Sequence, residues 1–431
     1  MSAKVSRARS YKDRKDKRGI KDVIPNLKTS FEDFGSNEKI KLSTEGFTLS
    51  IQDINSPSNL AYQFREQKNQ DITNESEQIA KSCGIYLEFD RAKTGSEKDW
   101  MYMFRVTIPG GGPINTKQWN ILDRIADKYT SSSIYTGKLQ PSLRFTTRQN
   151  IQLHWVKKKD LTKAIREIAE SGFYTLNGCG DNVRNVMGCP LSTYSELFNS
   201  NEWAQKVGKY FGLPTSAYMQ IFQIDKKYMR ELDDRTSEQK FKYGKTLLNR
   251  KFKIGFSTVH KDGERYVYDN CVEMRTNDIG IAPIVEANEV KKFQVYVGGG
   301  QGERTGYATY SALAEPLGIF DKNDLMTGLD TIVKIHQQWG DRENRHWARM
   351  KYVIYEKGIE WFRSQVRELS GIKFEMPNTK LDYGPRQLHF GWMKQEMDEL
   401  WSYGAFVENG RIIDGPNGKI KSMISFLMNK Y

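Results

Sequence analysis

The chain has 431 residues, of which 38% are hydrophobic and 12% aromatic, so it has room for two to four folded domains and cannot be a disordered polymer. Its apolar stretches stay short of the roughly 18 residues that span a bilayer, which predicts a soluble protein. Four scattered cysteines are too few for a disulfide framework, and the first twenty residues lack a signal-peptide core, so a reducing cytoplasm is the expected compartment.

The net charge of +13 suggests an anionic partner of some kind. Residues 1–18 hold eight Lys or Arg against Asp13 and Asp16, a net +6, which leaves +7 for the rest of the chain. This basic arm could contact RNA, but it has little aromatic content and no periodicity. We therefore interpret it as a solvated tail and expect neither a specific nucleic-acid partner nor a membrane partner.

The first compact unit is predicted to begin near Cys83, after a polar lead-in of short helices over residues 19–80. A strand at 100–108 is followed by the turn PGGGP and by an amphipathic helix at 116–129. A second strand at 143–156 and a second helix at 160–171 come next. This β-α-β-α order is half of a split sandwich with helices on one face of a small sheet.

A larger α/β unit is predicted over residues 172–355. It contains a Gly- and Asn-rich loop at 177–190, a helix at 202–211, and strands at 251–258 and 293–297, the second of which runs into the sequence GGGQG. A long helix at 324–339 precedes the charged segment 340–352. Helices at 358–369 and 420–431 and strands at 388–394 and 401–408 complete the expected elements.

The whole chain is thus predicted to be α+β with four parts: a tail and lead-in (1–80), a first ferredoxin-like half domain (81–171), a larger α/β domain (172–355) and an incomplete second half domain (356–431). The last part repeats the order of strand then helix without a second strand and helix. Such a fragment leaves an open sheet edge and an uncovered apolar face. We expect either a truncated chain or a second polypeptide that completes it.

Cations embedded in strands and tight loops are the unusual feature of the sequence, because an unpaired buried charge costs several kcal/mol. Taken singly, each is best interpreted as a surface cation or an internal salt bridge. Together they favour a pocket for an anion or for a cofactor that carries many carboxylates, since alternate residues of a strand face one side. The cations are Arg105, Arg144, Arg148, Arg184, Lys251 and Lys253.

Five segments around these cations resemble, in order, the signatures of the sirohaem-containing sulfite and nitrite reductases. They are SLRFTTRQNIQLHWV, NGCGDNVRNVMGCP, NRKFKIGF, YVGGGQG and GDRENRHWARMKY. Within that family the resemblance is strongest to the haemoprotein (beta) components of assimilatory sulfite reductases, and it runs from about Tyr86 to Tyr431. It implies a sirohaem between parts related by an internal two-fold repeat, each built partly from a ferredoxin-like half domain. The larger domain at 172–355 would then bind sirohaem and substrate.

The resemblance also implies residue roles. Arg105, Arg184, Lys251 and Lys253 match the four cations on the distal face of the sirohaem, where they would hold a doubly charged oxyanion and protonate its leaving oxygens. Further positions match residues that contact the macrocycle or its carboxylates: Arg144, Thr146, Arg148, Gln149, Gln152, Asn182, Arg250 and Arg349. Nitrite-reducing relatives tend to have Asn at the position of Lys253, so the Lys-x-Lys pair favours sulfite.

The implied activity is six-electron reduction of sulfite to sulfide, with electrons from ferredoxin or a flavoprotein. Full-length family members also bind a [4Fe-4S] cluster through cysteines in Cys-x5-Cys and Cys-x3-Cys patterns, and this chain has no cysteine after Cys271. We therefore expect the chain alone to be inactive. Two alternatives stay open, namely a nitrite reductase and a non-catalytic subunit that binds sirohaem or a partner.

Other conspicuous residues receive structural interpretations. Cys179 and Cys189 are separated by nine residues with a single histidine, His154, nearby in the sequence, so packed thiols are expected there and no metal site. The histidines are expected to lie in the core or at its rim: His154, His260, His336, His346 and His389. The three glycines at 298–300 lack the Gly-Lys-Ser/Thr ending of a phosphate loop, so a tight turn or close backbone packing is expected.

Overall fold

The computed structural model describes residues 57, 59–134, 136–228, 240–244, 246–304, 307, 309–378, 381, 388–416 and 418–431. The predicted basic arm and almost all of the lead-in lie outside these residues. The described part forms two compact units. Unit 1 comprises Val186–Val207 and Thr246–Gly404, and unit 2 comprises the chain up to Asn185, then Gly208–Lys245 and Ala405–Tyr431. Among the described helices, none combines the length and the apolar character needed to span a membrane.

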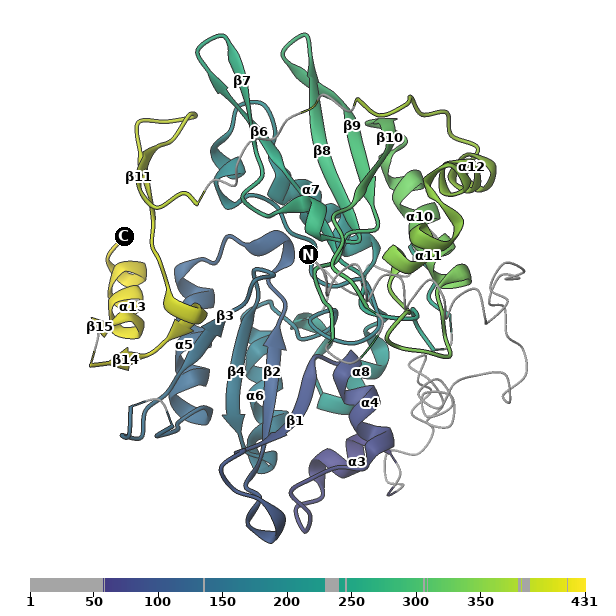
Figure 1. Cartoon of the computed structure of the whole chain (residues 1–431). Coiled ribbons are helices and arrows are strands. Elements are labelled where there is room, and N and C mark those ends of the chain that lie inside the picture. Colours follow the sequence, from purple (N-terminus) through teal and green to yellow (C-terminus); the bar gives the residue numbers. More distant parts are fainter. Residues whose placement is uncertain are drawn as a thin grey trace. The chain divides into compact units, whose positions relative to one another are not determined.

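Unit 2 is built around a five-stranded antiparallel sheet in the order β1-β2-β4-β3-β13 (Figure 1). Its strands are β1 (Ile85–Phe89), β2 (Trp100–Val106), β3 (Leu143–Phe145), β4 (Ile151–Val156) and β13 (Arg411–Ile412). Its helices are α3 (Leu60–Arg65), α4 (Asn74–Ser82), α5 (Thr116–Tyr129), α6 (Lys158–Glu170), α8 (Ser216–Phe222) and α13 (Ile420–Lys430), and a short hairpin joins β14 (Asp414–Gly415) to β15 (Gly418–Lys419).

The helices of unit 2 form where the sequence patterns require them. Helix α5 begins at a capping box in which the Asn115 side chain accepts from the Gln118 N–H and the Gln118 side chain accepts from the Asn115 N–H. Its apolar stripe, including Leu122 and Ile125, is buried. The predicted helices at 116–129 and 160–171 are therefore confirmed, the second as α6.

The predicted strand at 143–156 is wrong as a single strand, because a tight turn at 146–150 divides it into β3 and β4, which pair with each other. In this turn the Thr146 Oγ1 atom accepts from the N–H groups of Arg148 and Asn150, both at 3.2 Å. Gln149 adopts a φ of 52°, in the left-handed region. Because the Thr146 hydroxyl accepts from these two N–H groups, they do not need hydrogen bonds to a neighbouring strand, and the chain can reverse direction here.

Unit 1 contains a four-stranded mixed sheet in the order β10-β9-β8-β5, in which only β5 and β8 run parallel. Its strands are β5 (Ile254–Phe256), β8 (Ile279–Glu286), β9 (Glu289–Val297) and β10 (Glu315–Asp321). Two separate hairpins pair β6 (Thr258–Asp262) with β7 (Arg265–Asp269) and β11 (Gly391–Lys394) with β12 (Trp401–Gly404). The helices are most of α7 (Ser200–Tyr210), then α10 (Leu325–Trp339), α11 (Met350–Lys357) and α12 (Ile359–Ser370).

An aromatic cluster fills the core of unit 1 beneath the mixed sheet. The Trp203 ring lies 5.1 Å from that of Phe293, and Phe198 lies 5.5 Å from Phe293 on another side. The predicted strand at 251–258 is shorter than expected, because Lys251 and Lys253 precede β5 and β6 follows after Ser257. The predicted helices at 324–339 and 358–369 are confirmed as α10 and α12.

The C-terminal segment is shared between the units. Residues up to Gly404 belong to unit 1, whereas Ala405–Tyr431 join unit 2, where β13 pairs with β3 and α13 contacts α5. Large aromatic side chains of the β11–β12 hairpin are exposed, with Trp392, Trp401 and Tyr403 at 69%, 57% and 61%. The expected uncovered face of a second half domain stays a prediction. The boundaries predicted at 81, 172 and 356 stay a prediction.

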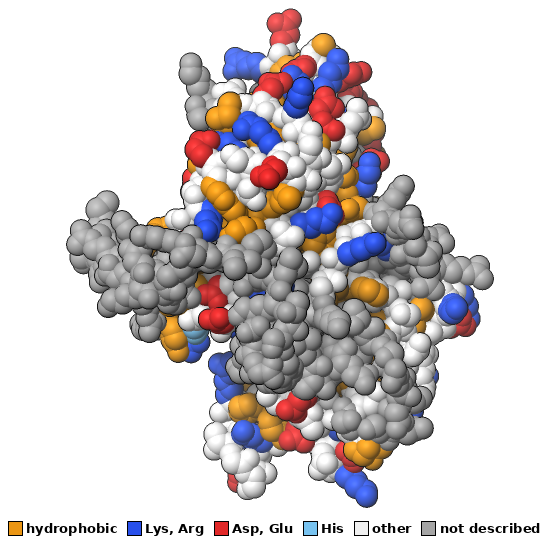
Figure 2. Space-filling view, turned by 90° about the vertical axis from the view of Figure 1, so that its right-hand side faces the viewer, with side chains coloured by type: hydrophobic (Ala, Val, Ile, Leu, Met, Phe, Trp, Pro, Cys, Tyr) orange, Lys and Arg blue, Asp and Glu red, His pale blue; other side chains and the backbone are white. Residues whose placement is uncertain are grey.

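On the face that Figure 2 presents, charges of both signs are interspersed toward the upper end of the molecule. The hairpin ends of unit 1 contribute exposed Lys261 and Glu264 from β6–β7 and exposed Glu289 and Lys291 from β9 and its turn. The positive net charge is therefore not gathered over these hairpins.

Candidate functional site

A row of polar and cationic side chains crosses the sheet of unit 2. Arg105 of β2 lies opposite Gln152 of β4, Gln152 lies opposite Arg144 of β3, and Arg144 lies opposite Arg411 of β13. Residues directly opposite each other on neighbouring strands point to the same face. Tyr102, three residues before Arg105, packs edge-on against Phe64 of α3 and marks the other, helix-covered face. Three arginines therefore share the face that these helices leave open.

Arg105 and Arg184 converge on one main-chain oxygen in unit 2. The Nη1 atoms of Arg105 and Arg184 donate to the carbonyl oxygen of Gly178 at 3.4 and 3.2 Å, and Nε of Arg184 donates to the Gly180 oxygen at 2.8 Å. The Arg105 guanidinium also lies 5.8 Å from the centre of the Tyr86 ring, whose burial raises the pKa of its hydroxyl to about 12. Neutral carbonyl oxygens thus orient two half-buried cations in unit 2.

Arg148 lies in the turn and does not extend the row. Its Nε and Nη2 atoms both donate to the Asn185 carbonyl oxygen, at 3.2 and 2.7 Å, and the Asn185 amide donates back to the Arg148 oxygen at 3.1 Å. The expectation that Arg144 and Arg148 face the same way along one strand is wrong, because alternation ends where β3 ends. Thr146 and Gln149 lie in the same turn.

Asn182 occupies the loop that carries Arg184 and is fully buried. Its amide nitrogen donates to the Cys179 oxygen at 2.8 Å. Its side-chain oxygen is buried and accepts no hydrogen bond from any residue the structure describes. A buried acceptor of this kind costs stability unless a ligand or water supplies a donor, so Asn182 is oriented as a binding residue would be.

In unit 1 two of the predicted residues, Arg349 and Lys253, contact one buried carboxylate, Asp278. Arg349 donates two hydrogen bonds to this carboxylate, from Nε to Oδ1 at 2.9 Å and from Nη2 to Oδ2 at 2.7 Å. The main-chain N–H of Lys253 donates to Oδ2 at 2.8 Å. Asp278 thereby fixes the backbone that carries Lys251 and Lys253. Phe252 between them is fully buried against His336, so the two lysines alternate with a core residue and both point away from the core.

Lys351, which the sequence pattern did not reveal, holds the glycine loop of unit 1. Its ammonium group donates to the carbonyl oxygens of Gly300 (3.2 Å), Gly302 (2.9 Å) and Tyr310. A Cβ atom on Gly299 would lie 2.2 Å from the Arg275 oxygen, so the triple glycine is required for close backbone packing, as expected.

Arg250 lies near His346 and Arg304 in the same unit. Partial burial, followed by the charges of Arg304 and Arg250, lowers the pKa of His346. The structure thus gathers Lys251, Lys253, Arg250 and Arg349 in unit 1, and Arg105, Arg144, Arg148, Arg184, Thr146, Gln149, Gln152 and Asn182 in unit 2. Their roles toward a ligand stay proposals.

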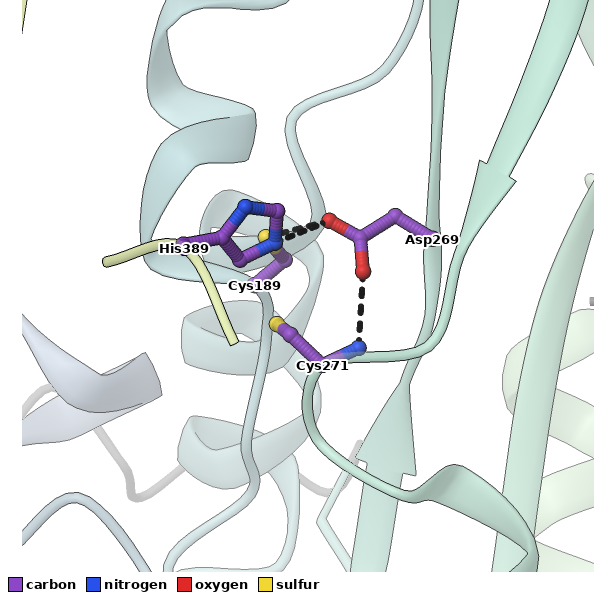
Figure 3. A group of neighbouring side chains, drawn as sticks. All are labelled: Cys189, Asp269, Cys271 and His389. Atoms are coloured by element: carbon purple, nitrogen blue, oxygen red, sulfur yellow. Dashed lines mark hydrogen bonds and ion pairs between the residues drawn. The ribbon is translucent and has the colours of Figure 1, made fainter. Parts of the chain in front are cut away.

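A second group of reactive side chains lies in unit 1, at the base of the β6–β7 hairpin (Figure 3). It consists of Cys189, Asp269, Cys271 and His389, whose ligand atoms all lie within 4.8 Å of one another. The Asp269 Oδ2 atom accepts from His389 Nε2 at 2.5 Å and from Cys189 Sγ at 3.5 Å, and its Oδ1 atom accepts from the Cys271 N–H at 2.8 Å. Cys189 is a buried thiol as predicted, but it is not an isolated one.

In this group, acidic side chains are hydrogen-bonded to basic ones, and the contacts shift the pKa values of Cys189, His389 and Asp269. Hydrogen bonds, above all with Cys271, lower the pKa of the Cys189 thiol to about 5, and the Asp269 contact is the main cause that raises the pKa of His389 to about 9. Despite its burial, the pKa of Asp269 is lowered by its hydrogen bonds to His260 and His389. The Asp-Asn-Cys run at 269–271 is the one local signal of this group in the sequence, because Cys189 and His389 are far from it in the chain.

Two family descriptions match the chain. Residues 95–171 match the "Nitrite/Sulfite reductase ferredoxin-like half domain", and residues 179–374 match the "Nitrite and sulphite reductase 4Fe-4S domain". The first covers β2 to α6 of unit 2, and the second covers the Arg184 loop and most of unit 1.

Curated relatives include the sulfite reductase [NADPH] hemoprotein beta-components of Shewanella sp. (strain ANA-3) and Shewanella loihica. Each is 32% identical over 354 residues, which is 80% of this chain and 59% of the relative. The chain therefore spans about three fifths of the length of these relatives.

The solved structure of the Mycobacterium tuberculosis NirA protein matches with a TM-score of 0.67 at 17% identity, over 92% of this chain and 62% of that one. At this identity the match shows a shared fold. With both family descriptions matched in order, over residues 95–171 and 179–374, the chain belongs to the nitrite and sulphite reductase family.

Proposed function

We propose that this chain forms the sirohaem- and substrate-binding part of a cytoplasmic sulfite reductase haemoprotein, which reduces sulfite to sulfide with electrons from ferredoxin or a flavoprotein. The observation that carries the proposal is the row Arg105–Gln152–Arg144–Arg411 on the open face of the unit 2 sheet. Charge complementarity matches this face to a tetrapyrrole edged with carboxylates. The curated relatives named as sulfite reductase hemoproteins support the same function.

The residues present fit such a cofactor. Arg144 and Arg411 offer charged donors, and Asn182 offers a buried oxygen that accepts no hydrogen bond from the described residues. When bound, sirohaem would supply the iron that binds sulfite and passes electrons to it. Arg144, with its Nε atom already oriented by the Asn409 oxygen at 3.1 Å, would hold a cofactor carboxylate.

The other cations would act on the substrate. Each pair of cations, Arg105 with Arg184 in unit 2 and Lys251 with Lys253 in unit 1, would bind oxygens of a doubly charged anion and stabilise the charge that develops there. The lysine ammonium groups can also donate protons to oxygens that leave as water. Asp278 positions the lysine pair, since it accepts a hydrogen bond from the main-chain N–H of Lys253.

The family description also names a [4Fe-4S] cluster, which usually takes four cysteine thiolates. The four cysteines of the chain are divided between the units, with Cys83 and Cys179 in unit 2 and Cys189 and Cys271 in unit 1. Neither unit offers four thiolates, so the described residues do not fit this cluster.

Sirohaem retention tests the cofactor site. Arg144→Ala should lower the sirohaem that copurifies with the chain, because a charged donor of the row is lost. Arg124→Ala is the matched control, since Arg124 lies on α5 and is 54% exposed. Haem absorbance per chain measures the result. Equal sirohaem content in the two variants would refute the assignment of the row.

Substrate preference tests the oxyanion site. In the sirohaem-loaded protein, Lys253→Asn should weaken sulfite binding about 10- to 100-fold, because one hydrogen bond from a charged group is lost. Nitrite binding should weaken less, and Lys261→Asn, at an exposed position of β6, should change neither; the anion-induced absorbance changes of the sirohaem measure both affinities. A wild-type preference for nitrite would favour the nitrite reductase alternative. Sirohaem absorbance that responds to neither anion would favour a non-catalytic subunit.

A further inference from the structure

The group at Cys189, Asp269, Cys271 and His389 has no task in sulfite reduction as proposed above. Its members come from distant parts of unit 1: the start of the short helical turn Pro190–Tyr194, the end of β7, the residues just after β7, and the segment before β11. Two thiols, an imidazole and a carboxylate form a donor set that a borderline-soft divalent ion prefers.

The spacing of these atoms suits a single ion. With metal–sulfur bonds of about 2.3 Å and metal–oxygen bonds of about 2.0 Å, tetrahedral ligands lie about 3.5 Å apart. The Cys189 Sγ and Asp269 Oδ2 atoms are 3.5 Å apart, and all four ligand atoms lie within 4.8 Å of one another. His389 Nε2 lies 2.5 Å from Asp269 Oδ2, which is a hydrogen-bond distance, so an ion would replace this hydrogen bond and move the two atoms apart. Burial of the Cys189 and Asp269 side chains, at 0% and 1% exposed, excludes water from this part of the site.

Outer groups orient the candidate ligands, as they do in metal sites. His260 of β6 places its Nε2 atom 3.4 Å from Asp269 Oδ2, and its Nδ1 atom lies 3.4 Å from Glu396 Oε1. On the other side of Asp269, the Cys271 N–H holds the second carboxylate oxygen at 2.8 Å. Both Asp269 oxygens are thus fixed before any ion arrives.

An entry path is also present. A pocket of about 190 Å³ is lined by His260, His389, Met393 and Glu396, among others, and it reaches the two imidazoles. The exposed fractions of the His260 and His389 side chains, 22% and 21%, agree with access from that side. An ion could therefore reach the buried thiols past His389.

We propose that Cys189, Asp269, Cys271 and His389 bind one zinc ion in a tetrahedral, four-ligand structural site. Binding releases the remaining protons of the two thiols and of the His389 imidazolium into solvent, and it leaves two thiolates, a carboxylate and a neutral imidazole on the metal. The ion ties the β6–β7 hairpin to the segment before β11. An iron–sulfur cluster is disfavoured because only two thiols are present and Asp269 Oδ2 occupies the space between Cys189, His260 and His389.

The test uses the full chain, freed of metal with a chelator under reducing conditions and then titrated with Co²⁺ and with Zn²⁺. One equivalent of Co²⁺ should produce thiolate-to-cobalt charge-transfer absorbance and tetrahedral visible bands, and one equivalent of Zn²⁺ should abolish them. Metal analysis of the untreated protein should find about one zinc per chain. These readouts need neither sirohaem nor sulfite turnover, so they are independent of the proposed function.

Cys271→Ser is the informative variant, because Cys271 is only partly buried and serine is nearly isosteric. It should lose the charge-transfer absorbance and bind Zn²⁺ at least 100-fold more weakly, whereas Cys179→Ser, in the other unit, should behave as wild type. Failure of reduced wild-type protein to bind Co²⁺ or Zn²⁺ would overturn the proposal. So would a Cys189–Cys271 disulfide found by mass spectrometry in the native protein, or iron with acid-labile sulfide at this site.

Discussion

Lys351 is a buried cation that three main-chain oxygens surround, and its side chain links α11 to the glycine loop. Burial, followed by the nearby charge of Arg349, lowers the pKa of Lys351 from 10.5 to about 8. Between these two values the unfolded chain binds a proton that the folded chain has released. The contribution of Lys351 to the free energy of unfolding therefore increases as pH rises from about 8 to 10.5.

Lys351→Met should remove this contribution. The wild type should gain stability relative to the variant across that pH window, on top of a constant offset from the carbonyl groups left unpaired. Urea unfolding followed by tryptophan fluorescence at a series of pH values measures both terms. Lys261→Met provides a control at an exposed position and should run parallel to wild type. Parallel curves for Lys351→Met as well would contradict the lowered pKa.

Some residues of the candidate site could be predicted from the sequence, and others could not. Arg105 and Arg184 stand out as charges among apolar or glycine-rich neighbours, and in the structure both donate to the Gly178 oxygen. The prediction that Arg148 lies on a strand was wrong, because the Thr146 hydroxyl, and not a neighbouring strand, accepts the hydrogen bonds of the Arg148 and Asn150 N–H groups. Arg411 escaped prediction because only long-range strand pairing brings it beside Arg144.

At the scale of elements, α13 is docked on α5 by buried polar contacts rather than by an apolar face. Lys421 lies 2.6 Å from both Asp123 and Asp127, and the Trp119 indole donates to Ser425 Oγ at 3.0 Å. Large apolar side chains of the same helix are exposed, with Phe426 at 61%. Specific polar pairing therefore holds this helix in place.

Lys421→Met should loosen α13, because two carboxylates lose their partner while the apolar stem is kept. A loss of about 1–3 kcal/mol would raise amide exchange in α13 about tenfold or more. Hydrogen exchange of peptides that cover 420–430 reports the change. Lys430→Met, at the exposed end of α13, should leave protection as in wild type, and unchanged protection in Lys421→Met would show that the ion pairs do not hold the helix.

Helices were better predicted than strands for a physical reason. The apolar faces of α5, α6, α10 and α12 can be recognised from the helical spacing of apolar residues in the sequence. Capping residues such as Asn115 mark where helices begin. The two-residue strand β13 carries no such pattern, because its strand character comes entirely from pairing with β3. The exchange of Ala405–Tyr431 into unit 2 is likewise a matter of tertiary contacts.

At the scale of the whole molecule, the four cations proposed to bind an oxyanion belong to both units, Arg105 and Arg184 to unit 2 and Lys251 and Lys253 to unit 1. Within unit 2, Arg105 and Arg184 donate to one carbonyl oxygen, so the effects of substituting them on sulfite affinity should be coupled. Arg105→Gln and Arg184→Gln, alone and combined in sirohaem-loaded protein, should give sulfite affinities that deviate from additivity by about 0.5–3 kcal/mol. Sulfite-induced absorbance changes measure the affinity, and strict additivity would refute joint action of this pair. Lys261→Gln replaces Arg105→Gln in the control cycle.

The pairing of β13 with β3 also bears on how the chain folds as it leaves the ribosome. Arg144 and Asn409, joined by a hydrogen bond, are separated by 265 positions. Domains generally fold N-terminal part first during synthesis, yet the sheet of unit 2 lacks its fifth strand until residue 411 has emerged. During that interval β3 is an unprotected edge, which is the kind of surface that nascent-chain chaperones cover. Completion of unit 2 is therefore a late event, set by translation of the last part of this sequence.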